Sequence, residues 1–317
     1  MFSIRTFNPA TDYPRHVEII NTIEEEPVTV TLLQNWDSLR PPENPYRRIV
    51  AVDATNRVIA VADCLQPQFR AVGDFNMHVL VDPAFKGHGL GSRLFEQMCQ
   101  FAEECGSYRL FSQVRDDQPE ALRFAEQRKF VVDRHIFDSI LDVTAFDESP
   151  YTGVIEAIEA TGISFTTLAA VGDSPENRQK LFALNHETAK DIPGENPFFV
   201  NFDALQKVLF DSPMAVLDGI TVAVEGDTWI GFAALMRDTD DVLGHFMTGV
   251  SRAYRGRKIA LALKLLAIRY ARRSAKRLIT NNDEANAPML AINRKLGYKQ
   301  LPGRYTLILT LKAKANP

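Results

Sequence analysis

The chain has 317 residues, enough for two domains that each bury a core of their own. Hydrophobic residues make up 45% and charged residues 24%, as in globular proteins, and the net charge of −4 gives no sign of nucleic-acid binding. No apolar run approaches the length of a membrane span, and the strand-like start of the sequence does not resemble a signal peptide. Three cysteines without a paired motif predict reduced thiols, no metal site and a cytoplasmic location.

The first half of the sequence alternates between strand-like and helix-like segments. The expected elements are a strand (3–7), two helices (13–26 and 31–39), a hairpin (48–62), a strand (76–81), a helix after residue 90, a strand (109–114), a short helix (119–127) and a closing antiparallel pair (130–143).

A connecting helix over 149–161, stopped by Gly162, leads into a second half of the same kind. The elements expected there are a strand (164–170), a helix capped near 173–177, a helix (202–210), a hairpin (220–235), a strand (242–250), a helix (255–273), a strand (277–281), a helix (288–295) and a final strand (305–311).

The most informative stretch is a strand that ends in Val81, a loop over 86–91 rich in glycine, and a helix. Glycines let the backbone turn tightly and leave N–H groups uncovered at the start of the helix, where they attract phosphate. The loop lacks the Gly-Lys-Ser/Thr ending of a nucleoside triphosphate site.

The same stretch occurs again 169 residues later, where Val250 to Ala260 corresponds position by position to Val81 to Gly91. The strand at 109–113 corresponds to 277–281, and Phe130 to Tyr298, at an offset of 168. So long a match at a nearly constant offset predicts a duplicated domain.

The repeated pattern resembles the acyl-CoA loop of the GNAT N-acetyltransferase superfamily. Lys86-x-x-Gly89-x-Gly91 and Arg255-x-x-Lys258-x-Ala260 are similar to its Arg/Gln-x-x-Gly-x-Gly/Ala motif, and 280–298 is similar to its last helix and following turn. The layout is similar to tandem acetyltransferases of the mycothiol synthase type. The resemblance implies an α+β fold of two tandem domains, each a central mixed twisted sheet flanked by helices. We expect domains at 1–148 and 163–317, joined by a connecting helix at 149–162.

The resemblance also implies that the strand before each loop parts from the strand after its helix, forming a V that admits the pantetheine arm of acetyl-CoA. The residues expected to bind this co-substrate belong to the two loops, the strand ends and the last helix: Val81, Lys86, Gly87, His88, Gly89, Leu90, Gly91, Ser92, Gly249, Val250, Arg255, Gly256, Arg257, Lys258, Ile259, Ala260, Asn286 and Asn293.

Members of the superfamily often carry a tyrosine on the last helix that protonates the departing thiolate. Ala125 and Asn293 stand at the matching positions, and neither can act as that acid. A free amine is mostly protonated at neutral pH, so transfer needs a base. His245 and Asp241 are the candidates in the second copy, and His78 and His88 lie at comparable places in the first.

By analogy with the family, the early helices and the loop after residue 191 form the acceptor wall of the second copy. Glu187, Asp191 and Glu195 lie close together there, and they could receive a cationic amine or form an ordinary exposed rim.

We therefore expect an enzyme that moves an acetyl group from acetyl-CoA to a primary amine, carried by a small molecule or peptide, by direct attack. The second copy is the expected active one because its last helix is more complete. The alternatives are the reverse assignment, and a non-catalytic protein that binds or senses acyl-CoA. We expect a monomer or homodimer, with neither a nucleic-acid nor a membrane partner.

Overall fold

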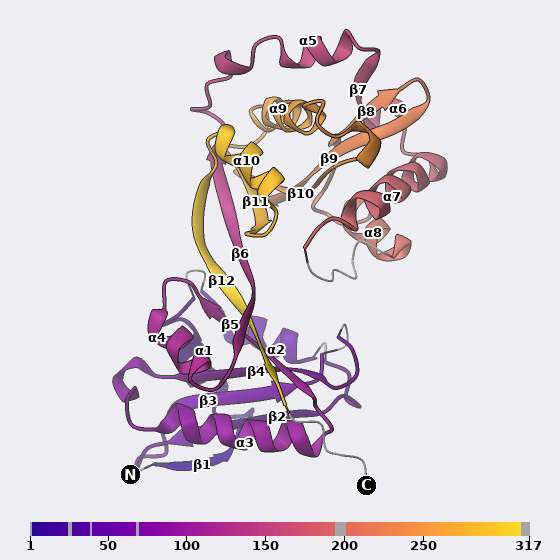
Figure 1. Cartoon of the computed structure of the whole chain (residues 1–317). Coiled ribbons are helices and arrows are strands. Elements are labelled where there is room, and N and C mark those ends of the chain that lie inside the picture. Colours follow the sequence, from indigo (N-terminus) through magenta and orange to yellow (C-terminus); the bar gives the residue numbers. More distant parts are fainter. Residues whose placement is uncertain (1, 25–26, 39, 68–69, 194–200, 312–317) are drawn as a thin grey trace. The chain divides into compact units, whose positions relative to one another are not determined.

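The computed structural model describes residues 2–24, 27–38, 40–67, 70–193 and 201–311. The chain divides into two compact units (Figure 1). Unit 1 comprises Met1–Asp133 and Tyr305–Pro317, and unit 2 comprises Arg134–Arg304.

Unit 1 is built on a sheet with the strand order β1-β2-β3-β4-β5-β12. Its strands are β1 (Ser3–Thr6), β2 (Tyr46–Val52), β3 (Val58–Leu65), β4 (Asp74–Val81), β5 (Arg109–Arg115) and the last part of β12 (Lys299–Thr310). Its helices are α1 (Tyr13–Ile20), α2 (Val30–Ser38), α3 (Leu90–Glu104) and α4 (Pro119–Glu126). Neighbouring strands from β1 to β4 are antiparallel, whereas β4 and β5 are parallel.

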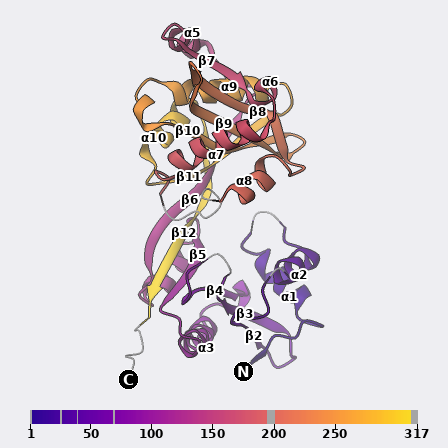
Figure 2. The same ribbon diagram turned by 90° about the vertical axis from the view of Figure 1, so that its right-hand side faces the viewer.

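Both faces of the central strands of unit 1 are covered. β2 and β3 are almost continuously buried and mostly apolar, with Arg48 and Asp63 as buried charged exceptions. One face packs on the apolar stripe of α3, with Leu94 and Met98 fully buried, and the other face packs on α1 and α2 (Figure 2). The core of unit 1 is therefore two layers deep, one on each side of the sheet.

Unit 2 repeats the arrangement with the strand order β6-β11-β10-β9-β8-β7. Its strands are β6 (Val131–Asp142), β7 (Ile163–Thr167), β8 (Ala215–Glu225), β9 (Thr228–Thr239), β10 (Val242–Val250) and β11 (Arg277–Asp283). Its helices are α5 (Val154–Glu159), α6 (Leu168–Val171), α7 (Pro175–Ala189), α8 (Phe202–Leu209), α9 (Ile259–Ala271) and α10 (Ala287–Lys295).

The helix α9 is apolar around most of its surface because it lies between two layers. One side packs on the sheet, and Ile155 and Ile158 of α5 belong to the same core. The predicted connecting helix is therefore part of unit 2. On the opposite face of the sheet, α7 and α8 enclose a separate core around Phe232.

The two units exchange their final strands. The sequence predicted a closing antiparallel pair over 130–143, and this is wrong: the segment forms one long strand, β6, that pairs antiparallel with β11 of unit 2. The end of β12 completes unit 1 instead, where Leu307 and Leu311 are buried in the core against α3. Figure 1 shows yellow β12 ending beside the strands of unit 1.

The compact units thus divide at residues 133 and 304, not at the predicted domain limits of 148 and 163. The hydrophobic pattern of a strand shows which face is buried, but it does not show which sheet edge the strand joins. No helix in the described part of the chain is long and apolar enough to span a membrane.

Replacing the buried Leu307 tests the exchange. We expect Leu307→Ala to cost about 2–5 kcal/mol, because it opens a cavity in the core of unit 1. Hydrogen exchange of peptides from α3 and β4 should accelerate, while peptides from α9 stay protected. Thr310→Ala, an exposed position on the same strand, is the matched control. Faster exchange confined to unit 2 would contradict the assignment of this strand.

Candidate active site

In both units the two parallel strands at the centre of the sheet part after a short ladder. β4 pairs with β5 only from Asp74 to Asn76, and β10 pairs with β11 only from Val242 to His245. Each strand continues for three or more residues beyond its last pair. The expected V is therefore present twice, at corresponding positions of the duplicated sequence.

The loops that follow the two V openings have the same backbone conformation. Gly87 and Gly256 both have positive φ angles, 82° and 79°. The next positive angle falls on Gly89 in unit 1 and on Lys258 in unit 2, at 78° and 63°, and each residue caps the following helix. Lys258 thus keeps a conformation that favours glycine, and its side chain is added to an otherwise unchanged loop.

The V of unit 2 opens into a cavity of ≈ 560 Å³. Its lining comes from the end of β10, the loop, the start of α9, the outer face of α10 and the end of α7. Among the residues predicted to bind acetyl-CoA, those that line it are Gly249, Val250, Arg255, Gly256, Lys258, Ile259, Ala260 and Asn286. The predicted set in unit 2 is therefore largely brought together in one place.

A second cavity of ≈ 630 Å³ lies on the other side of the same loop, between the loop and α5. Arg257 and Lys258 line it, so Lys258 is the loop residue that borders both cavities. Arg257 also lies 3.9 Å from Glu225 and stacks near the ring of Tyr254.

Arg255 is held at the mouth of the first cavity by two contacts. Its Nε donates to the carbonyl oxygen of Val250 at 3.0 Å, and its guanidinium pairs with Asp191 at 2.6 Å. Hydrogen bonds from Arg252 and Arg255 lower the pKa of Asp191 well below its usual value. The carboxylate therefore stays charged and positions the arginine.

Glu187, on α7, stabilises the same loop by accepting two hydrogen bonds. Its Oε1 accepts from the hydroxyl of Ser251 at 2.8 Å and from the backbone N–H of Arg252 at 3.1 Å. Glu187 and Asp191 thus both serve the loop, whereas Glu195, the third member of the predicted acidic group, lies outside the described residues. α7 can approach this closely because Gly249 has no side chain: a Cβ there would lie 2.4 Å from Thr188 Oγ1.

Three buried polar atoms around the V of unit 2 have no hydrogen-bond partner among the described residues: Thr248 Oγ1, Asn293 Oδ1 and His245 Nδ1. Thr248 lines the cavity. The predicted contact Asn293 does not line it, because its Nδ2 donates to Asn282 Oδ1 at 2.7 Å beneath α10. Buried polar groups usually find partners, and of these three residues only Thr248 lies where a ligand in the cavity can supply one.

The two predicted catalytic residues lie away from the cavity lining. His245 is only 9% exposed, and its Nε2 lies 2.9 Å from the hydroxyl of Tyr298. Burial and the charge of Lys264 lower the pKa of His245 well below its usual value, so it does not titrate near neutrality. Asp241 sits at the opposite end of β10 from the loop and pairs with Lys276 at 2.9 Å. Their role as the base stays a prediction, and these positions do not support it.

The predicted contacts of unit 1 form a more closed arrangement. Lys86 Nζ pairs with Glu120 at 3.3 Å, and the ring of His88 bends back onto the carbonyl oxygens of its own loop. Ser92 accepts from Arg128, and Gly91 lies against the ring of Phe124. Val81 packs at the edge of the core of unit 1 and, with Gly87, Gly89 and Leu90, frames the start of α3.

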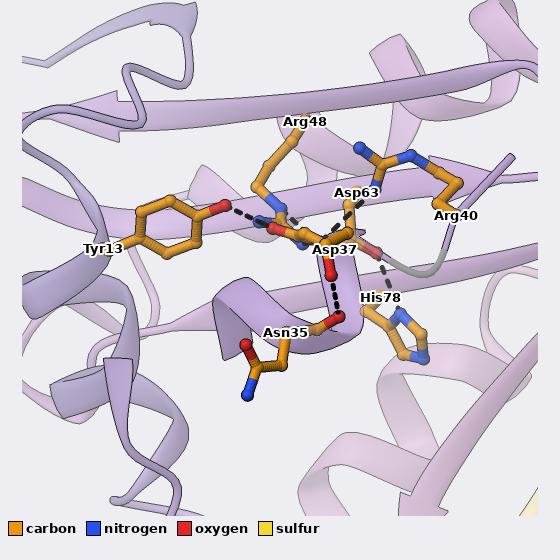
Figure 3. A network of polar contacts seen from close by, with 8 residues as sticks. Tyr13, Asn35, Asp37, Arg40, Arg48, Asp63 and His78 are labelled. Atoms are coloured by element: carbon orange, nitrogen blue, oxygen red, sulfur yellow. Dashed lines mark hydrogen bonds and ion pairs between the residues drawn. The ribbon is translucent and has the colours of Figure 1, made fainter. Parts of the chain in front are cut away.

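Unit 1 also contains a polar network that the sequence did not reveal (Figure 3). Asp63 on β3 lies opposite His78 on β4, with Asp63 Oδ1 2.9 Å from His78 Nδ1. Behind them, Arg48 lies between Asp63 and Asp37, and Tyr13 donates to Asp37 at 2.6 Å. His78 was noticed in the sequence, but the other members of the network lie on four other elements, so no local motif could connect them.

Comparison with known proteins identifies the family of the chain. The family model described as "Acetyltransferase (GNAT) family" matches residues 13–130 and again 187–298. The chain belongs to the GNAT acetyltransferase family. It carries two domains of this family in tandem and is an acyltransferase, as the sequence predicted. The expected α+β fold, with a mixed sheet flanked by helices in each domain, is confirmed.

Solved structures of GNAT proteins extend over the whole chain. A GCN5-related N-acetyltransferase from Sphaerobacter thermophilus is 20% identical, with a TM-score of 0.67 over 98% of this chain and 95% of its own. A tandem GNAT protein from the clavulanic acid biosynthesis pathway is 17% identical, with a TM-score of 0.64 over 100% of both chains. These similarities concern the fold.

A shorter match is found with a glucosamine 6-phosphate N-acetyltransferase from Trypanosoma brucei brucei. The two sequences are 28% identical over 125 residues, which cover 38% of this chain and 82% of that protein.

The buried Lys264, beside His245, makes the stability of this GNAT protein depend on pH. Burial lowers the pKa of Lys264 to about 7, and its ammonium lies 5.1 Å from the centre of the Tyr298 ring. Between pH 7 and 10 the unfolded chain binds a proton that the folded chain does not, so the unfolding free energy rises with pH. We expect Lys264→Met to raise stability at pH 7 and to flatten this rise.

Urea unfolding at several pH values measures both effects. Lys276→Met is the control, since Lys276 is an exposed lysine of the same unit. An equal slope in the wild type and in Lys264→Met would contradict the assignment.

Proposed function

We propose that unit 2 binds acetyl-CoA in the V between β10 and β11 and transfers the acetyl group to a primary amine by direct attack. In this step the amine nitrogen bonds to the thioester carbonyl carbon, the C–S bond breaks, and CoA leaves as a thiolate that takes up a proton. The amine must first lose a proton, since it is mostly protonated at neutral pH.

The observation that carries the proposal is the single cavity that joins the loop to the parted strands. Basic Arg255 and Lys258 line its loop end, and Thr248 and Gly249 line it on β10. Backbone N–H groups at the start of α9 and the two cations favour phosphate there. The second cavity, beside Arg257, gives room for the nucleotide end of the same long molecule.

An irregularity of β10 adds support. The register against β9 shifts between His245 and Met247, so Phe246 is the extra residue of a β-bulge. The bulge lies where β10 leaves β11, whereas the register between β3 and β4 in unit 1 runs without such a shift. A bulge redirects the strand and is frequent beside active sites. A bulge at this place in β10 fits the proposal that the strand positions the thioester.

The acceptor is proposed to be a primary amine. Because a relative is named for glucosamine 6-phosphate, this amine is the first probe to test, within a panel of amino sugars, polyamines and peptide amines. The second candidate function is a non-catalytic acyl-CoA-binding protein, favoured by Ala125 and Asn293 at the two acid positions. A cytoplasmic setting and a monomeric or homodimeric state belong to the proposal, and the described cysteines are free thiols.

Charge reversal at the loop tests the donor site. We expect Arg255→Glu to raise the dissociation constant of acetyl-CoA at least tenfold, measured by calorimetry, because it places a carboxylate beside the phosphates and beside Asp191. Lys258→Gly should change affinity little and should not reduce stability, since glycine suits the positive φ angle. An unchanged affinity in Arg255→Glu would contradict the proposal that unit 2 binds acetyl-CoA.

The hydroxyl of Thr248 separates ligand binding from folding. It has no partner among the described residues, so Thr248→Val should leave the unfolding free energy of the ligand-free protein unchanged or higher. If the hydroxyl bonds to acetyl-CoA, the same change should weaken binding by about 3- to 10-fold, the usual effect of one hydrogen bond. Thr221→Val, at a buried position of β8 outside the cavity lining, is the control. Equal affinity in both variants would contradict this contact.

A further inference from the structure

The pair formed by Asp63 and His78 lies across the two central strands of unit 1. The side chain of His78 is 45% exposed, whereas that of Asp63 is 11% exposed. Asp63 Oδ1 and His78 Nδ1 are 2.9 Å apart, and Figure 3 shows the imidazole at the end of the network that begins at Tyr13. The network therefore runs from buried charged groups to a titratable ring that solvent reaches.

The protonation state of Asp63 fixes the orientation of the imidazole. Burial disfavours the charged carboxylate, but the hydrogen bond and charge of His78 and the charge of Arg48 outweigh it, and the pKa of Asp63 falls to about 2. An ionised carboxylate only accepts hydrogen bonds. His78 Nδ1 is therefore the donor, and Nε2 is the ring nitrogen that can accept a proton.

The network behind Asp63 is largely buried and electrically balanced. Arg48 is 7% exposed and makes two hydrogen bonds to Asp37, at 2.6 and 3.0 Å. Arg48 Nε also lies 3.4 Å from Asp63 Oδ2. Two carboxylates and two arginines, Arg48 and Arg40, thus compensate each other.

The position of His78 matches the place where an amine would meet a thioester. The ladder of β4 and β5 ends at Asn76, and His78 lies two residues further on the same face of β4. Leu80, on that face, packs against the core of α1 and α2. His78 is therefore beside the V of unit 1, on the side of the sheet opposite to α3.

Unit 2 lacks this pair. At the equivalent register Ala234 lies opposite Met247, where unit 1 has Asp63 opposite His78. The pair is therefore not a general feature of the duplicated sheet. A network that served only to fasten α2 to the sheet would be complete with Asp37 and Arg48, and would not need a half-exposed imidazole at its end.

We propose that unit 1 is a second acyl-transfer site, in which His78, oriented by Asp63, takes the proton of an amine that approaches from the side of α1 and α2. The proton moves from the amine nitrogen to His78 Nε2, that nitrogen bonds to the carbonyl carbon of an acetyl-CoA held by the Lys86 loop, and the C–S bond breaks to release the thiolate. The inference rests on the proposed use of acetyl-CoA as donor, but not on the activity of unit 2.

Chemical modification tests the placement of His78 without knowledge of the acceptor. The full chain is treated with diethyl pyrocarbonate, with and without acetyl-CoA, and the modification rate of each histidine is read by peptide mass spectrometry. We expect acetyl-CoA to slow the modification of His78 at least threefold. This protection should disappear in Lys86→Glu and persist in Arg255→Glu. His135, which also pairs with a carboxylate, is the internal control and should be unaffected.

The outcomes separate the two proposals. If Arg255→Glu leaves acetyl-CoA affinity unchanged but His78 stays protected through Lys86, the donor site of unit 2 fails and the site of unit 1 stands. If acetyl-CoA does not protect His78, or protects it only through Arg255, the site of unit 1 is overturned.

Turnover gives the catalytic test. In the Arg255→Glu chain, we expect transfer to at least one amine of the panel to persist, and His78→Gln to reduce it at least a hundredfold, while His135→Gln has no effect. Absence of residual transfer, or residual transfer that His78→Gln leaves intact, overturns the proposal.

Asp63 acts through His78, so its test is a pH profile. The charged and titratable groups around the pair are Arg48 and Tyr46 on β2, Asp37 on α2, Arg40 in the segment after α2, and Tyr13 and His16 on α1. Asp63→Asn removes the negative charge that stabilises the imidazolium, so the acid limb of the rate profile should move to lower pH. A lower rate with an unmoved profile would leave Asp63 with a structural role only and overturn its part in the proposal.

Discussion

The structure depends on the early end of hydrogen bonding between two parallel strands in each unit. A parallel ladder normally continues as far as both strands run, because backbone groups removed from water need partners. Here β10 and β11 keep four pairs, and β4 and β5 keep three. Beyond its last pair, each strand leaves backbone groups without a partner across the gap. In unit 2 the loop with Arg255 and Lys258 borders the cavity at one end, while most of the remaining lining is apolar, with Met247, Ile259 and Ile292 among its residues.

The two units share the backbone of the V and its loop but differ in the side chains beside them. The positive φ angles of the loops recur at the same positions, so the backbone of the turn has been kept even where Lys258 replaces a glycine. The side chains beside the V have diverged. Unit 2 has Met247 and Ala234 next to an open cavity, whereas unit 1 has His78 and Asp63 next to a loop whose lysine is paired with Glu120. Each unit therefore holds a different share of the groups that acyl transfer needs.

Much of this could be predicted from the sequence because it is encoded locally. The two loops follow from neighbouring residues, such as Val81 and the glycines after Lys86, and the duplication follows from a repeat at a nearly constant offset. The parted strands were expected from the resemblance to the superfamily. Long-range relations could not be predicted in this way. Nothing near His245 indicates that Tyr298 accompanies it into the core, and nothing near Arg255 indicates that Asp191 holds it. The exchange of β6 and β12 was missed for the same reason, since both strands have patterns that either sheet could accept.

The exchanged strands give the chain an order of completion during synthesis. In the described residues, every strand and helix assigned to unit 2 precedes residue 305, whereas the core of unit 1 lacks Leu307 and Leu311 until that later segment is made. The half that leaves the ribosome first is therefore the half that is finished last. Before β12 is synthesised, the edge of β5 that it later covers is open to other strands, including those of neighbouring nascent chains. This topology makes the folding of the first domain depend on a segment that is synthesised after the whole of the second.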